Sequence, residues 1–326
     1  MIPYIQPKTF SQDSFNYYLQ HAIETNHFAN YGWAAKLLEE KAREILKIDD
    51  SKAVIATSSG TGALAAIIQG IRRHTENKKR RVCTQDFTFP TNSLGPAEGP
   101  IVADLNNTCM IDFDERHINE SGDIIILTNC FGHLYDIDLV ETKLKDKIVI
   151  YDNAASPYSF FKGKNSCNYG VGSFISLHHT KPIGFGEGGL AIIDKEYEKY
   201  TRAAVNFGMQ DGVFNENGGN YKISEISAAG ILQWWDQFDI GDLASKYVDN
   251  YYKVRYEMRR CEGDFWPNHA DEIFFPNCLP FIHKEPTNIS EFEGKEVKKY
   301  YRPLRGFPMS TFIYDRISCI SLTEGL

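Results

Sequence analysis

Short apolar runs recur along the first two thirds of the chain. Most lack the alternation of a half-exposed strand, so we expect strands in a sheet whose two faces are both covered by helices. Segments with helical spacing, such as 61–73, separate these runs. This pattern predicts an α/β fold with a mostly parallel, seven-stranded sheet flanked by helices. The predicted strands are 53–57, 81–84, 101–104, 124–128, 147–152, 172–177 and 189–193.

The two ends of the chain show a different pattern. Helical spacing dominates residues 10–48, and a long helix is expected at 243–260. Shorter segments rich in Phe, Pro and Tyr follow it. We therefore predict a large domain, residues 1–240, and a smaller α+β domain, residues 241–326. We expect the N-terminal helices to pack on the small domain.

The composition of the 326-residue chain narrows the function classes. Its formal net charge of −8 disfavours a non-specific nucleic-acid binder. No apolar run approaches the ~20 residues of a membrane-spanning helix, and the N-terminus lacks the layout of a signal peptide. The seven cysteines contain no CxxC pair, which argues against a zinc site or a disulfide framework. Free thiols fit a reducing cytoplasm. We expect a cytoplasmic protein without a metal, nucleic acid or membrane partner.

The stretch from Ser176 to Gly189 contains the most specific chemistry. Lys181 lies between two predicted strands, five residues after the hydroxyl of Ser176 and just before a glycine-rich turn. A lysine in this setting can hold an aldehyde cofactor as a Schiff base if burial keeps its amine neutral, and Ser176 can donate to a phosphate. His178 and His179 are neighbours that point to opposite faces of a strand, so they make a poor metal chelate. His178 faces the same way as Ser176 and is a candidate for contact with substrate.

A second candidate is Asp152, the last residue of a predicted strand. The carboxyl ends of strands are where α/β sheets bind ligands. A carboxylate there can keep the pyridine nitrogen of pyridoxal 5'-phosphate (PLP) protonated, which makes the ring an electron sink. Alone, Asp152 fits a helix N-cap or a loop equally well. Together with Lys181, it forms the pair that PLP chemistry requires.

The turn that contains Gly60, Thr61 and Gly62 joins a strand to a helix. Its backbone N–H groups and the positive end of the helix dipole form a natural seat for a phosphate. Continued to Ala65, the turn also matches the G-x-G-x-x-A pattern of dinucleotide-binding proteins, with Asp86 as the acidic residue near the end of the next strand. A plain strand-to-helix turn is the third interpretation.

Two further segments carry candidate residues. Phe87 and Phe89 follow a predicted strand, where an aromatic ring can stack on a planar cofactor, although core packing is equally expected for either ring. The segment 218–225 is typical of a helix start, with Ser224 as the N-cap. Asn220 and Lys222 in that segment can reach an anion, and Lys222 is a second candidate for contact with substrate.

Taken in order, these stretches resemble the sugar aminotransferases of the DegT/StrS type, which are PLP enzymes of the aspartate-aminotransferase fold (fold type I). The resemblance covers nearly the whole chain. The stretches that carry it are Gly60-Thr61-Gly62-Ala63-Leu64, Phe87-Thr88-Phe89, Asp152-Asn153-Ala154-Ala155, Ser176-Leu177-His178-His179-Thr180-Lys181, Gly186-Glu187-Gly188-Gly189, Gly219-Asn220-Tyr221-Lys222-Ile223-Ser224-Glu225 and Lys298-Lys299-Tyr300-Tyr301-Arg302-Pro303-Leu304.

The resemblance implies a reaction. Lys181 would hold PLP as the internal aldimine and later move a proton between cofactor and substrate carbons, while Asp152 would pair with the pyridine nitrogen. Enzymes of this type convert a keto group on a nucleotide-linked deoxysugar to an amine, commonly with L-glutamate as donor, in ping-pong order. Synthesis of lipopolysaccharide O-antigen, other surface glycans and antibiotic sugars uses such products.

The resemblance also implies cofactor contacts. The backbone N–H groups of Thr61 and Gly62 and the hydroxyl of Ser176 would hold the phosphate, and Phe89 would stack on the ring. Asn220 would reach the phosphate of the neighbouring subunit's cofactor. The expected assembly is therefore a homodimer with shared active sites.

The chain departs from the family pattern in two places. Family members usually have glutamine or histidine three residues after the aspartate, whereas this chain has Ala155, so a contact near the cofactor's ring hydroxyl is missing. The C-terminus, which shapes the sugar pocket, is short for the family. Members with histidine at the lysine position are sugar dehydratases, and Lys181 argues against that branch. Two alternatives stay open: an NAD(P)-dependent oxidoreductase that uses the turn at 60–65, and a non-catalytic relative that binds PLP or a sugar nucleotide.

Overall fold

A seven-stranded sheet forms the centre of the computed structural model, which describes residues 1–77, 80–113, 118, 123–209, 211–214, 217–271 and 273–326. Its strand order is β1-β9-β8-β5-β4-β2-β3. β9 runs antiparallel to its two neighbours, and the other strands are parallel. The strands are β1 Lys52–Thr57, β2 Val82–Gln85, β3 Ile101–Ala103, β4 Ile124–Thr128, β5 Ile148–Asp152, β8 Gly172–Ser176 and β9 Gly189–Asp194. The predicted sheet is thus confirmed, with each strand end within one residue of its expected place.

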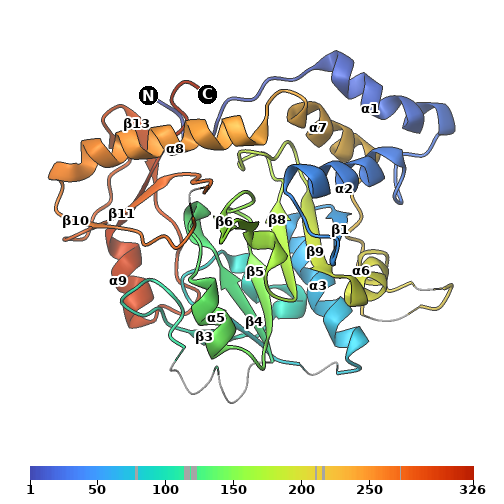
Figure 1. The fold of residues 1–326 in the computed structure, drawn as a ribbon, viewed down its shortest axis with the longest axis horizontal. Helices are drawn as coiled ribbons and strands as arrows, with labels where there is room; N and C mark the ends of the chain where they lie inside the picture. The colour runs from blue at the N-terminus through green and yellow to red at the C-terminus, as the bar shows by residue number, and fades with distance from the viewer. Residues whose placement is uncertain (78–79, 114–117, 119–122, 210, 215–216, 272) are drawn as a thin grey trace.

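Helices cover both faces of this sheet (Figure 1). Along β1, Val54 and Ala56 pack in a core with α2 and α7, whereas Ala53 and Ile55 pack in a second core with α3 and α6. Both faces are buried, which is why the strand is apolar throughout. The helices are α1 Gln12–Thr25, α2 Trp33–Ile45, α3 Gly60–His74, α5 Ile137–Lys143, α6 Glu198–Val205, α7 Glu225–Trp235, α8 Ile240–Glu257 and α9 Pro308–Arg316.

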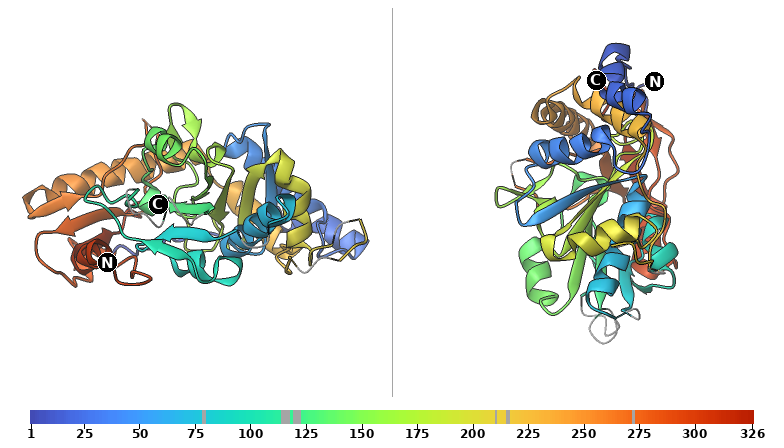
Figure 2. Two further views of the ribbon diagram at one scale, coloured as in Figure 1. Left: turned by 90° about the horizontal axis from the view of Figure 1, so that it is seen from below. Right: turned by 90° about the vertical axis from the view of Figure 1, so that its right-hand side faces the viewer.

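A second, antiparallel sheet lies near the C-terminus of the chain, in the order β10-β11-β14-β13-β12. It confirms the predicted smaller α+β region, and α8 and α9 both contact β11. In Figure 2 this region lies at one end of the molecule, opposite α1. The remaining strands are β10 Gly263–Phe265, β11 Leu279–His283, β12 Glu291–Phe292, β13 Lys295–Lys298 and β14 Ile317–Ile320, with a small hairpin of β6 Phe160–Phe161 and β7 Lys164–Asn165.

The N-terminal helical region is broken into α1 and α2 at Asn26, whose positive φ of 53° ends the first helix. Both helices pack on α7. The Glu225 carboxylate at the start of α7 accepts the N–H groups of Ala34 and Ala35 and so caps α2. The extended residues before α1 reach the second sheet, where Ile2 pairs with β13. The division of the chain at residue 240 and the packing of the N-terminal helices on a smaller domain stay predictions.

The arrangement of the sheet brings several strand ends to one edge. β4, β5 and β8 are parallel neighbours that end at Thr128, Asp152 and Ser176. α3 follows β1 at the same edge, so its N-terminus faces these three residues. Ligands bind at such edges in α/β sheets. Among the described residues, no helix is both long and apolar enough to span a membrane.

Candidate active site

A cavity of about 330 Å³ lies at this edge of the sheet, between the strand ends and residues from the two ends of the chain. The strand ends Thr128, Asp152 and Ser176 line it together with Lys181. The opposite wall includes residues of the extended N-terminus and of the segment after β13. The further lining residues are Tyr4, Ile5, Ser59, Gly60, Thr61, Phe89, Thr91, Phe131, Ala154, Ala155, Phe174, His178, Thr180, Glu187, Asn277, Lys298, Tyr300 and Tyr301.

Asp152 is held rigidly on the floor of this cavity, with 3% of its surface exposed. One carboxylate oxygen accepts hydrogen bonds from Asn92 Nδ2 and Thr128 Oγ1, each at 3.2 Å, and the other accepts the N–H of Ala154 at 3.1 Å. Burial raises the pKa of Asp152, and these donors and the charge of Lys181 oppose the rise. The carboxylate is therefore oriented for a further cationic partner within the cavity.

Lys181 stands on a tight turn between β8 and β9. Burial lowers the pKa of its amine below the ordinary value, and the nearby Asp152 carboxylate works in the opposite direction. The two predicted residues thus lie close enough to influence each other's charge. A lysine with a lowered pKa has a larger neutral fraction near pH 7, which is what a nucleophilic amine needs.

The first turn of α3 faces Ser176 across a narrow gap. A Cβ built on Gly60 would come within 3.1 Å of the Ser176 Cβ, so glycine lets the first turn of α3 pack directly beside the end of β8 and its hydroxyl. Ser59 caps the helix by accepting the N–H of Gly62 at 3.0 Å. The Thr61 hydroxyl bonds to Thr91 at 2.9 Å. Thr61, Gly60 and Ser176 line the cavity, whereas the Gly62 amide serves the helix cap.

The glycine-rich turn after Lys181 is required by close backbone contacts. A Cβ on Gly184 would lie 2.2 Å from the carbonyl oxygen of His178. A Cβ on Gly189 would lie 2.3 Å from the carbonyl carbon of Ser59. Gly189 therefore lets β9 pass directly behind the first turn of α3, and it links the Lys181 turn to the helix N-terminus.

Phe89 and His178 lie at the rim of the cavity. Phe89 is 54% exposed, and its ring is 6.5 Å from that of Tyr301 in an edge-on arrangement. His178 Nδ1 is 2.8 Å from the Thr180 hydroxyl, and Nε2 lies 3.5 Å from the Glu187 carboxylate. Both side chains are thus in reach of a bound molecule.

Asn220 and Lys222 lie outside the set of described residues that lines the cavity. Asn220 is exposed and pairs with Asn206 in a short bridge. The Lys222 amine lies 3.9 Å from the centre of the Phe207 ring and is buried without a hydrogen-bond partner among the described atoms. The predicted N-cap, Ser224, accepts the N–H of Ser227 and begins α7 as expected.

The cavity is widened at Ala155, the position where the sequence lacks the larger polar residue. Asn277, in the segment that leads into β11, also lines the cavity. Its side-chain oxygen is buried and has no partner among the described atoms. A polar atom of this kind is costly unless a ligand or water satisfies it.

Sequence reasoning missed several lining residues. Thr128 ends β4, so the argument used for Asp152 could have found it. Asn92 lies three residues after Phe89, but only the fold turns its amide toward Asp152. Tyr4 comes from the N-terminus and carries no local signal of its role. Lys298 and Tyr300 lie in the stretch 298–304 that contributed to the resemblance, but no role was assigned to them.

The structure argues against a dinucleotide site at the turn 60–65, because Asp86, the acidic residue that such a site needs, is already engaged. Asp86 is fully buried, and its carboxylate accepts the backbone N–H groups of Arg305 and Phe307. It is therefore not free to bind a ribose hydroxyl. Among the described residues no cluster of His, Cys, Asp and Glu could hold a metal ion.

Comparisons with known proteins agree with this geometry. The chain is 25% identical over 286 residues to GDP-perosamine synthase of Escherichia coli O157:H7, covering 81% of this chain and 76% of that protein. The fold is similar to that of DesI with its TDP-sugar product (TM-score 0.80, 18% identity, 97% and 86% of the two chains). It is also similar to Helicobacter pylori PseC, an aminotransferase involved in the biosynthesis of pseudoaminic acid (TM-score 0.78, 17% identity, 97% and 92%).

A family model extends the comparison to most of the chain. Residues 11–254 match it, a range that includes Gly60, Asp152, Lys181 and α7. Gly60, Asp152 and Lys181 line the cavity, and the tryptophans of α7 hydrogen-bond to the turn that carries Lys181. The chain therefore belongs to the DegT/DnrJ/EryC1/StrS aminotransferase family and is a PLP-dependent sugar aminotransferase.

Proposed function

We propose that this enzyme transfers the amino group of L-glutamate to the keto group of a nucleotide-linked deoxysugar, in ping-pong order. The observation that supports this most directly is the pair formed by Lys181 and Asp152 in one cavity. Amino transfer through PLP requires a carboxylate that faces the pyridine nitrogen and an amine that is neutral near pH 7. Asp152 is a buried carboxylate in the cavity, and burial lowers the pKa of the Lys181 amine.

The residues of the cavity fit the cofactor. PLP, when bound, supplies an electron sink for bonds at the substrate carbon. Asp152, fixed by Asn92 and Thr128, would keep a proton on the pyridine nitrogen. The N-terminus of α3 and the adjacent hydroxyl of Ser176, both on the cavity wall, suit the phosphate. Lys181 would hold the aldehyde carbon covalently, and its Nζ would then carry the proton between carbon atoms.

Further contacts complete the proposed cofactor site. Thr61 would donate to the phosphate from the first turn of α3, where the helix dipole favours an anion. Phe89 would cover one face of the ring, which would also bury its exposed side chain. Asn277 would use its unpartnered side-chain oxygen or amide near the ring edge that Ala155 leaves open.

The outer wall of the cavity supports a sugar-nucleotide substrate. The rings of Tyr4, Tyr300 and Tyr301 offer flat apolar surfaces for a sugar, and Lys298 adds a positive charge for a phosphate. His178 at the rim would contact the sugar or the donor. The relatives named for GDP-perosamine and for a TDP-sugar product fit the same substrate class.

A homodimer would complete the site. The loop before Asn220 exposes apolar side chains, with Val213 and Phe214 each 65% and Phe207 48% exposed. Apolar surface of this kind is usually covered by a partner. A second copy that covers the loop would bring Asn220, and with it Lys222, to the phosphate and substrate of the partner's cavity.

We place the enzyme in the cytoplasm, because all seven cysteines are free thiols.

The first experiment is an absorbance spectrum of the purified protein before and after L-glutamate is added. We expect a visible band that shifts to the near ultraviolet with glutamate and is absent in Lys181→Ala. Nucleotide-linked keto-sugars are then supplied as a panel, and the amine product is detected by mass. A colourless protein that stays colourless with added PLP, or full turnover by Lys181→Ala, would refute the proposal.

A separate experiment tests the shared site. Lys181→Ala and Asn220→Asp variants are each expected to be nearly inactive as pure homodimers. Mixed after mild dissociation in equal amounts, they should recover about a quarter of wild-type activity, because half of the dimers are mixed and one site in each is intact. No recovery, with mixed dimers present by native mass spectrometry, would place Asn220 in the site of its own chain.

A further inference from the structure

The turn that carries Lys181 has an unusual set of supports. Within the turn, the N–H of Lys181 bonds to the carbonyl of His178, and the N–H of Gly184 bonds to the carbonyl of Lys181. The N–H of His179 also bonds to the carbonyl of Gly186, and the N–H of Phe185 bonds to that of Leu177. Four further carbonyls of the turn accept hydrogen bonds from side chains elsewhere in the fold, namely those of His179, Pro182, Ile183 and Gly184. The position of Lys181 therefore depends in part on these side chains.

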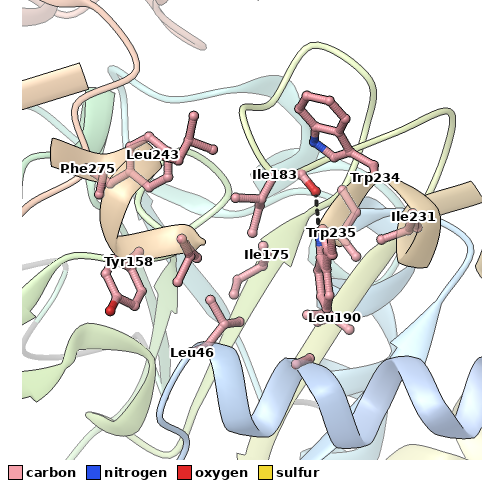
Figure 3. Packing of buried hydrophobic residues seen from close by; sticks show 14 of the residues in the cluster. Leu46, Tyr158, Ile175, Ile183, Leu190, Ile231, Trp234, Trp235, Leu243 and Phe275 are labelled. Atoms are coloured by element: carbon pink, nitrogen blue, oxygen red, sulfur yellow. Dashed lines mark hydrogen bonds between the residues drawn. The ribbon is translucent and has the colours of Figure 1, made fainter. Parts of the chain in front are cut away.

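Two indole rings of α7 provide the first support. Trp234 Nε1 donates to the carbonyl of Pro182 at 3.1 Å, and Trp235 Nε1 donates to the carbonyl of Ile183 at 2.7 Å. Figure 3 shows the second bond, with Trp235 packed beside Leu190 in the core. These two bonds fix the residues that directly follow Lys181.

Lys8 provides the second support, from the extended segment before α1. Its amine donates to the carbonyl oxygens of His179 and Lys181, each at 2.6 Å, and to that of Gly184. An ammonium group has three N–H donors, so its donors match the three acceptors. The carbonyls lie on both sides of Lys181, and one belongs to Lys181 itself.

Among the described residues, this ammonium contacts the turn and Trp234, which belongs to the first support. None of the ion pairs among the described residues involves Lys8. Burial lowers its pKa to about 7, whereas the three carbonyls favour its charged form. The positive charge of Lys8 adds to burial in lowering the pKa of His179. The ring of Trp234 lies 5.4 Å from the Lys8 amine, so both supports meet.

We propose that Lys8 is a positioning residue that ties together the carbonyls around Lys181 and so holds the catalytic amine in the cavity. This rests on the proposed role of Lys181 in amino transfer. Without the ammonium, the carbonyls of His179 and Gly184 would lose the donor that joins them, the Lys181 carbonyl would keep only the N–H of Gly184, and the turn would open more often. Lys181 would then sample orientations that do not reach the substrate carbon.

Hydrogen exchange in the cofactor-free protein tests the positioning directly. In Lys8→Met, the amides of 179–186 should exchange about tenfold faster than in the wild type or more, because the turn opens more often. Amides of β4 and β5 should be unchanged. Lys41→Met is the matched control, since Lys41 also joins an N-terminal segment to α7, through Asp236, but does not touch the turn. Unchanged exchange at 179–186 in Lys8→Met would overturn the proposal.

Kinetics of the loaded enzyme give the second readout. Lys8→Met should lower kcat about tenfold with little change in the KM for glutamate, because the substrate pocket stays intact. Lys8→Gln, which keeps one donor group, should be intermediate, and it replaces Lys8→Met if that variant does not fold. An equal rise in KM for both substrates with normal kcat would refute the positioning role. If exchange rises as expected but the wild type transfers no amino group, the proposed function fails and the positioning of Lys181 stands.

Discussion

The carboxylate of Asp86 accepts the backbone N–H of Phe307 at 2.8 Å, across 221 residues of sequence. It also accepts the N–H of Arg305, so one buried side chain joins the end of β2 to the segment before α9. Tyr300 and Tyr301, which line the cavity, lie just before this segment. Asp86 therefore fixes the wall of the cavity that faces the cofactor floor.

Replacing Asp86 should weaken this joint. Asp86→Ala leaves two backbone amides without an acceptor and is expected to lower the free energy of unfolding by about 1–3 kcal/mol. Chemical denaturation measures this loss. Asp138→Ala is the control, because its pair with Lys162 is exposed and screened by solvent, so its removal should have a much smaller effect. Equal losses in the two variants, or NAD(P) binding that disappears with Asp86→Ala, would contradict the capping role.

The indole of Trp235 offers a second test. Trp235→Phe keeps an aromatic ring but removes the pyrrole part of the indole, including the N–H that the Ile183 carbonyl accepts. We expect the unpaired carbonyl to cost about 1–3 kcal/mol in addition to the lost packing, together with weaker retention of PLP. Denaturation and dialysis against buffer measure the two effects. Trp33→Phe makes the same change at the partly buried start of α2 and should retain PLP normally. Identical PLP retention in both would show that the bond does not hold the turn.

Gly189 is expected to tolerate no side chain. In Gly189→Ala the new Cβ would overlap the Ser59 carbonyl carbon, so β9 or the first turn of α3 must move and the phosphate seat with it. We expect PLP affinity to fall at least about tenfold, because the bonds to the phosphate are charge-assisted. Fluorescence titration of the cofactor-free protein measures this. Gly230→Ala should bind PLP normally, since its Cβ would meet Phe185 only at 3.5 Å.

The lowered pKa of Lys181 predicts a pH dependence. In the cofactor-free protein, acylation of Lys181 should rise with pH and reach half of its maximum below about 10.4, the ordinary lysine value, because the buried amine loses its proton at lower pH. Asp152→Asn removes a charge that raises this pKa, so the midpoint should move to still lower pH. Peptide mass spectrometry after brief labelling gives both curves, with Lys181 of the denatured chain as the reference. A Lys181 curve in the folded protein that coincides with the curve in the denatured chain would contradict the expectation.

The same shift has a consequence for stability. Because folding lowers the pKa of Lys181, the unfolded chain binds more protons between the folded and unfolded pKa values. Stability should therefore rise with pH across that window, and Lys181→Met should flatten the rise. Denaturation at several pH values between neutrality and pH 10 measures the difference. A wild-type slope equal to that of Lys181→Met would show that the pKa is not lowered.

Local pattern was sufficient for most of the large sheet and for the two central site residues. A strand buried on both faces must be apolar throughout, so β4, β5 and β8 could be located from sequence alone. Asp152 interrupts such a run at its end, and Lys181 stands between two of them. The carboxyl ends of parallel neighbouring strands lie at the same side of the sheet. Asp152 therefore meets Lys181, because it ends β5 and Lys181 follows the neighbouring strand β8.

What the tertiary structure alone decided lies in contacts between distant segments. The Lys8 ammonium, the Asn92 amide and the Asp86 carboxylate have no local pattern that marks their partners, because each bonds to chain that is 60 or more residues away. The pairing of Ile2 with β13 likewise depends on the tertiary fold, which brings the N-terminus next to this strand. The sequence by itself thus determined the strands, the Asp152–Lys181 pair and the glycine turns, since periodicity and strand ends are local properties. The supports of Lys181 and the outer wall of the cavity were decided by packing, which brings together groups that sequence separation hides.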